Sequence, residues 1–149
     1  FYVRILPYRT IDDRIDGLVI TFTDITIAKQ AEEILVAEKN YRHFFESAKE
    51  GIFFLDMQTG KIIDLNYSLL NWLGTTKEQV SERPIWEMDF FKSFFDTKAQ
   101  WMKLKGKGII SKEKIKIKPV DGKLRSVDCI GNTYESEENE IIQFFIREE

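Results

Sequence analysis

Residues 51–74, GIFFLDMQTGKIIDLNYSLLNWLG, restrict the fold of this chain more than any other stretch. Residues 52–55 form an apolar run of aromatic and β-branched side chains, which suit a pleated sheet surface. A polar turn with a late glycine follows at residues 56–61. The next run, residues 61–65, has the length of a paired strand. The stretch therefore begins with a predicted β-hairpin.

Asn66 directly follows this hairpin. Its side chain can accept hydrogen bonds from the free amides of a following turn, so we expect it to be a helix N-cap. Tyr67, Leu70 and Leu73 recur at roughly helical spacing, and Gly74 suits a C-terminal helix stop. A hairpin, a capped short helix and a glycine stop thus follow one another in a specific order. Thr75 or Thr76 could cap a further short turn in the manner of a capping box.

The second half of the chain predicts three more strands, at residues 109–118, 124–130 and 141–146. The first two are joined through an Asp-Gly turn at residues 120–123, a strong hairpin signal. By period-2 geometry, Ile115 and Ile117 share one face with Glu113, and the other face carries lysines 112, 114, 116 and 118. We interpret these lysines as a solvated sheet face rather than a nucleic-acid site, because aromatic and arginine side chains are not interleaved with them.

The first 25 residues repeat the plan of the C-terminal hairpin: a strand that includes Pro7, a polar loop at residues 11–17, and a strongly β-prone run at residues 18–23. A two-stranded hairpin alone is marginal in water, so these strands are expected to need a packing partner. An N-terminal hairpin native to a single domain is the alternative interpretation.

The order of elements from Tyr41 to Glu149 resembles a PAS domain, and residues 1–25 with the Asp24-Ile25-Thr26 triplet resemble the end of a preceding one. The resemblance implies an α+β fold: a five-stranded antiparallel sheet with short helices on one face, preceded by a long linker helix and a β-hairpin. It divides the chain into the C-terminal hairpin of a truncated PAS domain (residues 1–25), a linker helix (26–46) and a PAS domain (47–149).

The expected linker helix, residues 27–46, has an a/d seam with one polar breach at Gln30. The seam could be shared between two chains, or the helix could be amphipathic and cover its own sheet. The candidates for a dimer contact are Ile27, Ile34, Ala37, Tyr41 and Phe44.

The aromatic-rich stretch after Arg83-Pro84 is expected to continue as a long helix through Trp101 to Leu104, which in the PAS fold walls a ligand cavity against the sheet. Plain core is the alternative role for these side chains. The candidates for a pocket lining, whose direction is open to a one-residue slip, are Phe54, Trp72, Trp86, Phe90, Phe94, Ile115, Ile117 and Cys129.

The sequence nominates no catalytic residue and no metal site. It contains no P-loop, dinucleotide fingerprint, HExxH or CxxC, and its single histidine, His43, and single cysteine cannot form a usual zinc site. Haem-binding PAS domains use a histidine on the long helix, but residues 85–104 contain none. Flavin-binding light sensors carry their reactive cysteine on a helix, whereas Cys129 falls in a predicted strand. FAD, a small organic ligand and no ligand at all remain open.

We therefore expect a regulatory module rather than an enzyme: a cytoplasmic PAS sensor of a multi-domain signalling protein, favouring a tandem-PAS sensor histidine kinase. A homodimer formed through the linker helix, with neighbouring PAS and kinase domains in the same chain, is the expected partnership. A net charge of −3 favours neither nucleic acid nor an acidic membrane, and no apolar run has the roughly 20 residues of a membrane span. The alternatives are a ligand-free PAS that serves as a dimerisation or spacer element, and a regulatory domain of a diguanylate cyclase or transcription factor.

Overall fold

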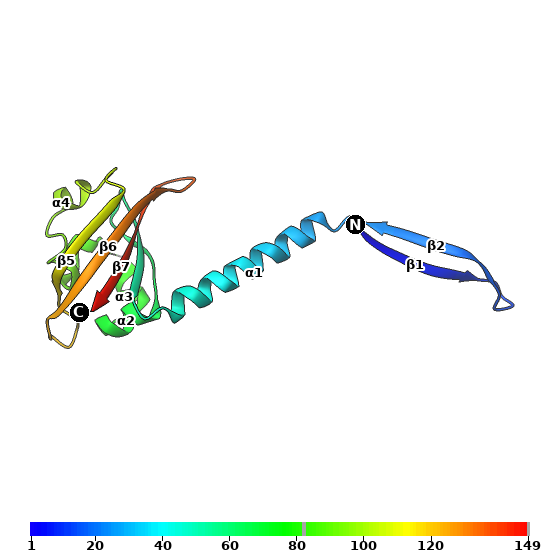
Figure 1. The fold of residues 1–149 in the computed structure, drawn as a ribbon, viewed down its shortest axis with the longest axis horizontal. Helices are drawn as coiled ribbons and strands as arrows, with labels where there is room; N and C mark the ends of the chain where they lie inside the picture. Colours follow the sequence, from blue (N-terminus) through cyan, green and yellow to red (C-terminus); the bar gives the residue numbers. More distant parts are fainter. Residues whose placement is uncertain (82, 149) are drawn as a thin grey trace. The chain divides into compact units, whose positions relative to one another are not determined.

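The protein is described here by a computed structural model covering residues 1–81 and 83–148. It separates into two compact units, Phe1–Arg42 and His43–Glu149, which are described in turn (Figure 1). Glu149, the expected end of the PAS domain, lies outside the described residues, as does Glu82.

The first unit begins with an antiparallel hairpin of β1 (Tyr2–Arg9) and β2 (Ile15–Thr23). Both strands are edges, so Pro7 fits in β1 opposite Leu18 without interrupting a central ladder. Nearly all side chains of the hairpin are exposed on both faces, including Phe22 at 69%. The hairpin forms its own two-stranded sheet and is not inserted into the larger one.

The long helix expected after the hairpin is confirmed as α1 (Thr26–Ser47). Asp24 precedes it and accepts hydrogen bonds from the Thr26 backbone amide (3.0 Å) and hydroxyl (2.6 Å), which lower the pKa of this exposed carboxyl. The only buried residue of α1 is Phe45, in its last turn.

The second unit contains the expected five-stranded antiparallel sheet, with the order β4-β3-β7-β6-β5. Its strands are β3 (Gly51–Asp56), β4 (Ile62–Leu65), β5 (Ile109–Ile117), β6 (Arg125–Glu135) and β7 (Glu140–Glu148). The terminal hairpin β6–β7 therefore supplies the two strands that lie beside β5 and β3.

Five short helical segments connect β4 to β5: α2 (Tyr67–Leu73), α3 (Lys77–Ser81), the 3₁₀ turns η1 (Ile85–Glu87) and η2 (Asp89–Phe91), and α4 (Lys98–Met102). Asn66 caps α2 as predicted, and Gly74 ends it in the left-handed conformation at φ 70°. At α3, Gln79 accepts from the Thr76 backbone amide at 3.3 Å, which is one half of a capping box.

The prediction that the aromatic-rich stretch after Arg83-Pro84 forms a long helix through Trp101 to Leu104 is wrong. Ile85, Met88, Phe91 and Phe94 are buried at intervals of three residues, which is the period of a 3₁₀ helix rather than the 3.6 of an α-helix. The chain therefore forms tight 3₁₀ turns here. It resumes an α-helix only after Thr97, whose hydroxyl accepts from the Gln100 amide at 3.3 Å.

The expected face assignment in β5 is also partly wrong, because a bulge interrupts its pairing with β6 between Lys112 and Ile115. Lys114 adopts φ 54° within the bulge, and the extra residue changes which side chains face the core. Ile115 and Ile117 are buried as predicted, but Glu113 is exposed and does not share their environment. Lys112 instead turns inward, donates to the Phe94 carbonyl at 2.8 Å and lies over the Phe95 ring.

Candidate functional site

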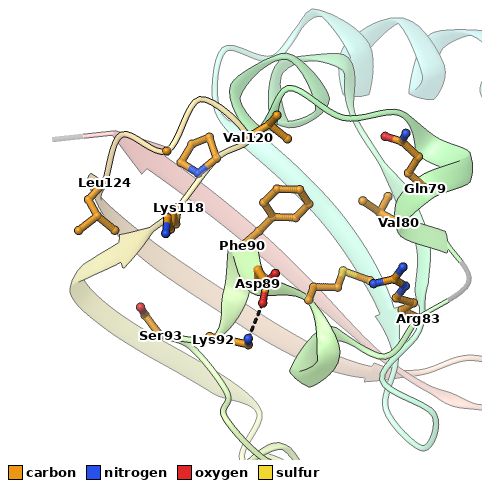
Figure 2. Close-up of a pocket in the computed structure, with 13 residues that line it drawn as sticks. Gln79, Val80, Arg83, Asp89, Phe90, Lys92, Ser93, Lys118, Val120 and Leu124 are labelled. Atoms are coloured by element: carbon orange, nitrogen blue, oxygen red, sulfur yellow. Dashed lines mark ion pairs between the residues drawn. The ribbon is translucent and has the colours of Figure 1, made fainter.

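An open groove of about 670 Å³ lies between the loop joining β5 to β6 on one side and α3 with η2 on the other (Figure 2). We call it the cationic groove. Its apolar lining is Val80, Met88, Phe90, Pro119, Val120 and Leu124, and its polar lining is Gln79, Arg83, Asp89, Lys92, Ser93, Lys118 and the backbone of Gly122.

Among the residues that the structure describes, three cations and one carboxylate line the cationic groove. Asp89 pairs with Lys92, both largely exposed. The hydrogen bond from Lys92 is the main reason why the pKa of the Asp89 carboxyl is lowered, and Lys118 and Arg83 add smaller Coulombic contributions. Within the described part of the chain, Arg83 and Lys118 have no ion-pair partner. An anion entering the groove would therefore meet Arg83 and Lys118, neither of which is held in an ion pair by another described residue.

The loop wall of the groove is fixed to the helical layer at one point. The Val120 amide donates to the Leu73 carbonyl at the end of α2 with a length of 3.0 Å. The turn lies one residue earlier than predicted, at residues 119–122, and is closed by a hydrogen bond from the Gly122 amide to the Pro119 carbonyl, with Gly122 at φ 76°. The opposite wall is held by Lys77 at the start of α3, whose ammonium contacts Asp64 of β4 at 2.6 Å.

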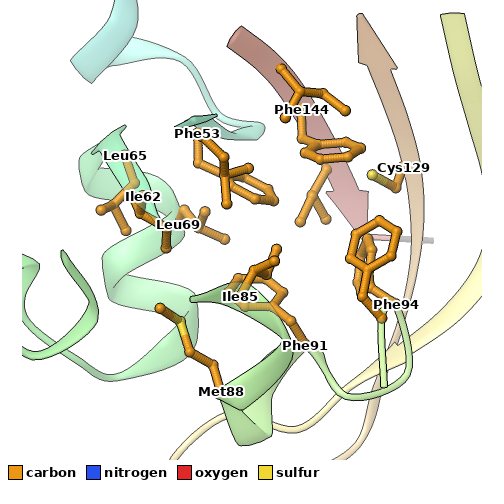
Figure 3. Close-up of a cluster of buried hydrophobic side chains, with 14 of the residues drawn as sticks. Phe53, Ile62, Leu65, Leu69, Ile85, Met88, Phe91, Phe94, Cys129 and Phe144 are labelled. Carbon is orange, nitrogen blue, oxygen red and sulfur yellow. The ribbon is translucent and has the colours of Figure 1, made fainter. Parts of the chain in front are cut away.

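Of the predicted pocket residues, only Phe90 lines the cationic groove. Phe94, Ile115, Ile117 and Cys129 are buried in the core between the helices and the sheet (Figure 3). The space is filled by aromatic packing: Phe53 lies 5.3 Å from Phe91 and 5.2 Å from Phe144 between ring centroids. These side chains therefore take the plain-core role that the sequence left open.

The prediction for Phe54 is wrong by one residue. Phe53 and Leu55 point into the core, while Phe54 points to the opposite face of β3 and lies 5.7 Å from Phe45 of α1 between ring centroids. Residues 52–55 are all apolar, so no alternation marks the inner face. Trp72 and Trp86 are half-buried and pack against the core cluster.

Outside the cationic groove, Asn66 is the centre of a set of buried hydrogen bonds. Its side chain is completely buried and has four hydrogen bonds. Its carbonyl oxygen accepts from the amides of Ile52 (3.0 Å) and Leu69 (3.2 Å), and its amide nitrogen donates to the carbonyls of Phe45 (3.0 Å) and Glu50 (2.9 Å). One side chain thereby joins the end of α1, the start of β3 and the start of α2. We call this arrangement the Asn66 joint.

The titratable side chains outside the groove offer little reactive chemistry. Burial raises the pKa of the Cys129 thiol to about 12, despite a small opposing effect of Lys112. His43 is exposed on α1. Across residues 1–81 and 83–148, no group of three or more His, Cys, Asp or Glu side chains is arranged to hold a metal ion. None of the helices in these ranges is long and apolar enough to cross a membrane.

Sequence reasoning missed most of the cationic groove. Arg83, Lys118, Val120 and Leu124 lie beside the Arg-Pro break and the Asp-Gly turn, two features that the sequence does mark. The signal that could have found them is the gathering of basic and exposed apolar residues at these two loops.

Comparisons with known proteins agree with this architecture. One PAS domain family model matches residues 1–26 and a second matches residues 39–107. The solved PAS domain of an HTR-like protein from Haloarcula marismortui is 22% identical, with a TM-score of 0.69 over 82% of this chain and 99% of that one. A PAS domain from a two-component sensor histidine kinase is 17% identical, with a TM-score of 0.64 over 76% and 97% of the two chains. The PAS domain of nitrogen regulation protein NR(II) from Vibrio parahaemolyticus is 10% identical, with a TM-score of 0.56 over 72% and 96%. No curated protein matches the sequence.

Proposed function

We propose that this chain, whose residues 1–26 and 39–107 match PAS domain family models, is a sensory signal-transduction module whose output leaves through α1. PAS domains are regulatory modules, so the work to be explained is a change in conformational populations rather than a chemical reaction. A ligand shifts such an equilibrium only by the difference between its affinities for the two states.

The Asn66 joint is the observation that carries this proposal. Any rearrangement that displaces α2 or β3 must change the hydrogen bonds that Asn66 makes to Phe45 and Glu50. Because a buried amide left without partners costs about 1–3 kcal/mol per lost bond, the end of α1 is expected to follow the domain. The packing of Phe45 on Phe54 adds an apolar contact to the same connection.

Native mass spectrometry of the purified protein tests sensing against a specific second candidate, a PAS domain that binds nothing and serves as a spacer. The filled interior favours this second candidate. A stoichiometric extra mass, with altered amide hydrogen exchange at residues 43–50 when it is removed, supports the sensor. A bare chain that stays bare in cell extract, with unchanged exchange, supports the spacer.

We further propose that the complete protein is a tandem-PAS sensor histidine kinase of the cytoplasm, in which residues 1–25 are the last hairpin of a preceding PAS domain. The match of residues 1–26 to a PAS model and the almost complete exposure of this hairpin support the second part. Similarity to the PAS domain of a two-component sensor histidine kinase supports the proposal that the protein is a kinase. The single unpaired cysteine supports a reducing compartment such as the cytoplasm. The sequence that follows residue 149 in the gene is the decisive test. A histidine kinase core there would support the proposal, and a diguanylate cyclase or DNA-binding domain would contradict it.

A homodimer through α1 completes the proposal. Ile27, Ile34 and Phe44 on the predicted seam are 83%, 67% and 78% exposed, so the apolar stripe is uncovered in the single chain. A parallel partner helix would bury it.

A further inference from the structure

We propose that the cationic groove binds a small organic anion, a carboxylate carried on an apolar body, as the ligand of the sensor. This inference rests on the proposed sensory function. It places the ligand outside the core between helices and sheet, which packed aromatic side chains occupy.

The charge of the groove selects an anion. Among its described residues, Arg83, Lys92 and Lys118 line it together with one carboxylate, Asp89, which is already paired with Lys92. Arg83 and Lys118 have no ion-pair partner within residues 1–81 and 83–148. An arginine guanidinium offers two parallel donors to a carboxylate, and a lysine ammonium adds a point charge.

The apolar lining selects a ligand with a hydrophobic body. Val120 and Leu124 are 66% and 61% exposed on the loop, and the ring of Phe90 lies between the two walls (Figure 2). An alkyl or aryl group in the groove would cover these side chains, with a gain of about 25 cal/mol for each Å² removed from water. The volume of about 670 Å³ falls in the usual range for small-molecule sites. Single-stranded nucleic acid usually stacks its bases on successive aromatic side chains, and among the described lining residues Phe90 is the only aromatic one.

The groove is also connected to the proposed output. Val120 of its loop is hydrogen-bonded to Leu73 at the end of α2, and α2 begins at Asn66, which holds the Phe45 carbonyl of α1. A ligand that draws the loop toward η2 would therefore pull on the helix that the Asn66 joint positions.

Isothermal titration of the full chain with hexanoate tests the proposal. Hexanol lacks the charge, acetate lacks the apolar body, and inorganic phosphate supplies charge alone. We expect saturable one-to-one binding of hexanoate and at least about tenfold weaker binding of each of the other three probes. The double variant Arg83→Gln/Lys118→Gln should weaken hexanoate binding about tenfold or more. Lys116→Gln, an exposed lysine nearby on β5 that does not line the groove, is the matched control and should bind as the parent does.

Two results would overturn the proposal: no saturable hexanoate binding up to about 10 mM, or equal binding by the parent and the double variant. Melting temperatures of the variants, which change only exposed or groove-lining side chains, verify that both remain folded. Hydrogen exchange at residues 43–50 separates this inference from the proposed function. Hexanoate binding without an exchange change keeps the site and removes the sensing role. If another ligand alters amide hydrogen exchange at residues 43–50 and hexanoate does not bind, the sensing role is kept and the proposed site is removed.

Discussion

At the scale of single residues, Asn66 shows how one buried polar side chain can hold three elements together through backbone hydrogen bonds. It is the one polar residue among the buried side chains of residues 1–81 and 83–148, and each of its four hydrogen bonds goes to a backbone group of a different residue. Its position after the first hairpin is visible in the sequence, but its bonds to Phe45 and Glu50 are tertiary and are not.

Replacing Asn66 with alanine is expected to lower the free energy of unfolding by about 3 kcal/mol, since several buried backbone groups lose their partner at once. Urea denaturation monitored by tryptophan fluorescence measures this loss. Asn71, exposed on the same helix, provides the matched control, and Asn71→Ala should change stability by no more than about 0.5 kcal/mol. Similar values for the two variants would contradict the importance of the joint.

The reactivity of the buried Cys129 thiol is expected to depend on pH and on folding. Burial raises the pKa of its thiol from 9.0 to about 12, so the folded protein keeps the thiol protonated through pH 8–9 and should not react with a disulfide reagent such as dithionitrobenzoate. In urea at the same pH the single thiol should react fully. Because the thiol of the folded protein holds its proton more tightly than that of the unfolded chain, its contribution to the free energy of unfolding is complete below pH 9 and is lost as pH rises toward 12. Rapid labelling of the folded protein at pH 8 would show that the thiol is accessible and would reopen a redox role.

At the scale of elements, the sequence predicts strands and capped helices well and predicts the aromatic stretch poorly. The β3–β4 hairpin, the N-cap Asn66 and the helix stop Gly74 carry local sequence signals that need no tertiary context. Ile85, Met88, Phe91 and Phe94 recur every three residues, a period that is easily taken for the 3.6 of an α-helix over so short a length. The face of β3 could not be predicted either, because residues 52–55 are apolar on both sides and α1 covers the second side with Phe45.

The seam of α1 leads to a prediction at the same scale. Ile34→Asp and Tyr41→Asp place charges in the proposed helix interface, so a dimeric parent should become monomeric in both variants. Light scattering coupled to size exclusion measures the mass. Lys39→Asp introduces the same side chain on the opposite face of the helix and should leave the dimer intact. A dimeric parent whose mass survives both seam substitutions would exclude the shared helix.

At the scale of the whole molecule, the buried core belongs to one unit. Every buried hydrophobic side chain described lies between Phe45 and Ile146, and none lies in the N-terminal hairpin. From the sequence, the hairpin at residues 1–25 is expected to belong to a separate PAS domain because it repeats the plan of the C-terminal strands. The sequence could not predict the cationic groove, since the groove depends on how the loop between β5 and β6 stands against η2 and α3.

Removal of residues 1–25 is therefore expected to leave the melting temperature of the remaining chain within about 2 °C of the parent value in differential scanning calorimetry. The hairpin amides should exchange with deuterium much faster than those of β7, because an isolated hairpin is marginally stable. A drop in melting temperature of about 5 °C or more would mean that the hairpin supports the PAS unit.

The bulge in β5 has a consequence for how this domain tolerates small deletions. Loss of a single codon between Lys112 and Ile115 would remove the extra residue and straighten the strand, and Lys112 and Ile115 would then stand two positions apart, opposite Cys129 and Val127. With a spacing of two, Ile115 and Ile117 would keep facing the core and Lys112 would stay on the same side of the sheet, beside the Phe94 carbonyl. Lineages of this protein should therefore accept the loss of one residue at Glu113 or Lys114 more readily than the loss of one residue elsewhere in β5, where the two faces of the strand would be exchanged.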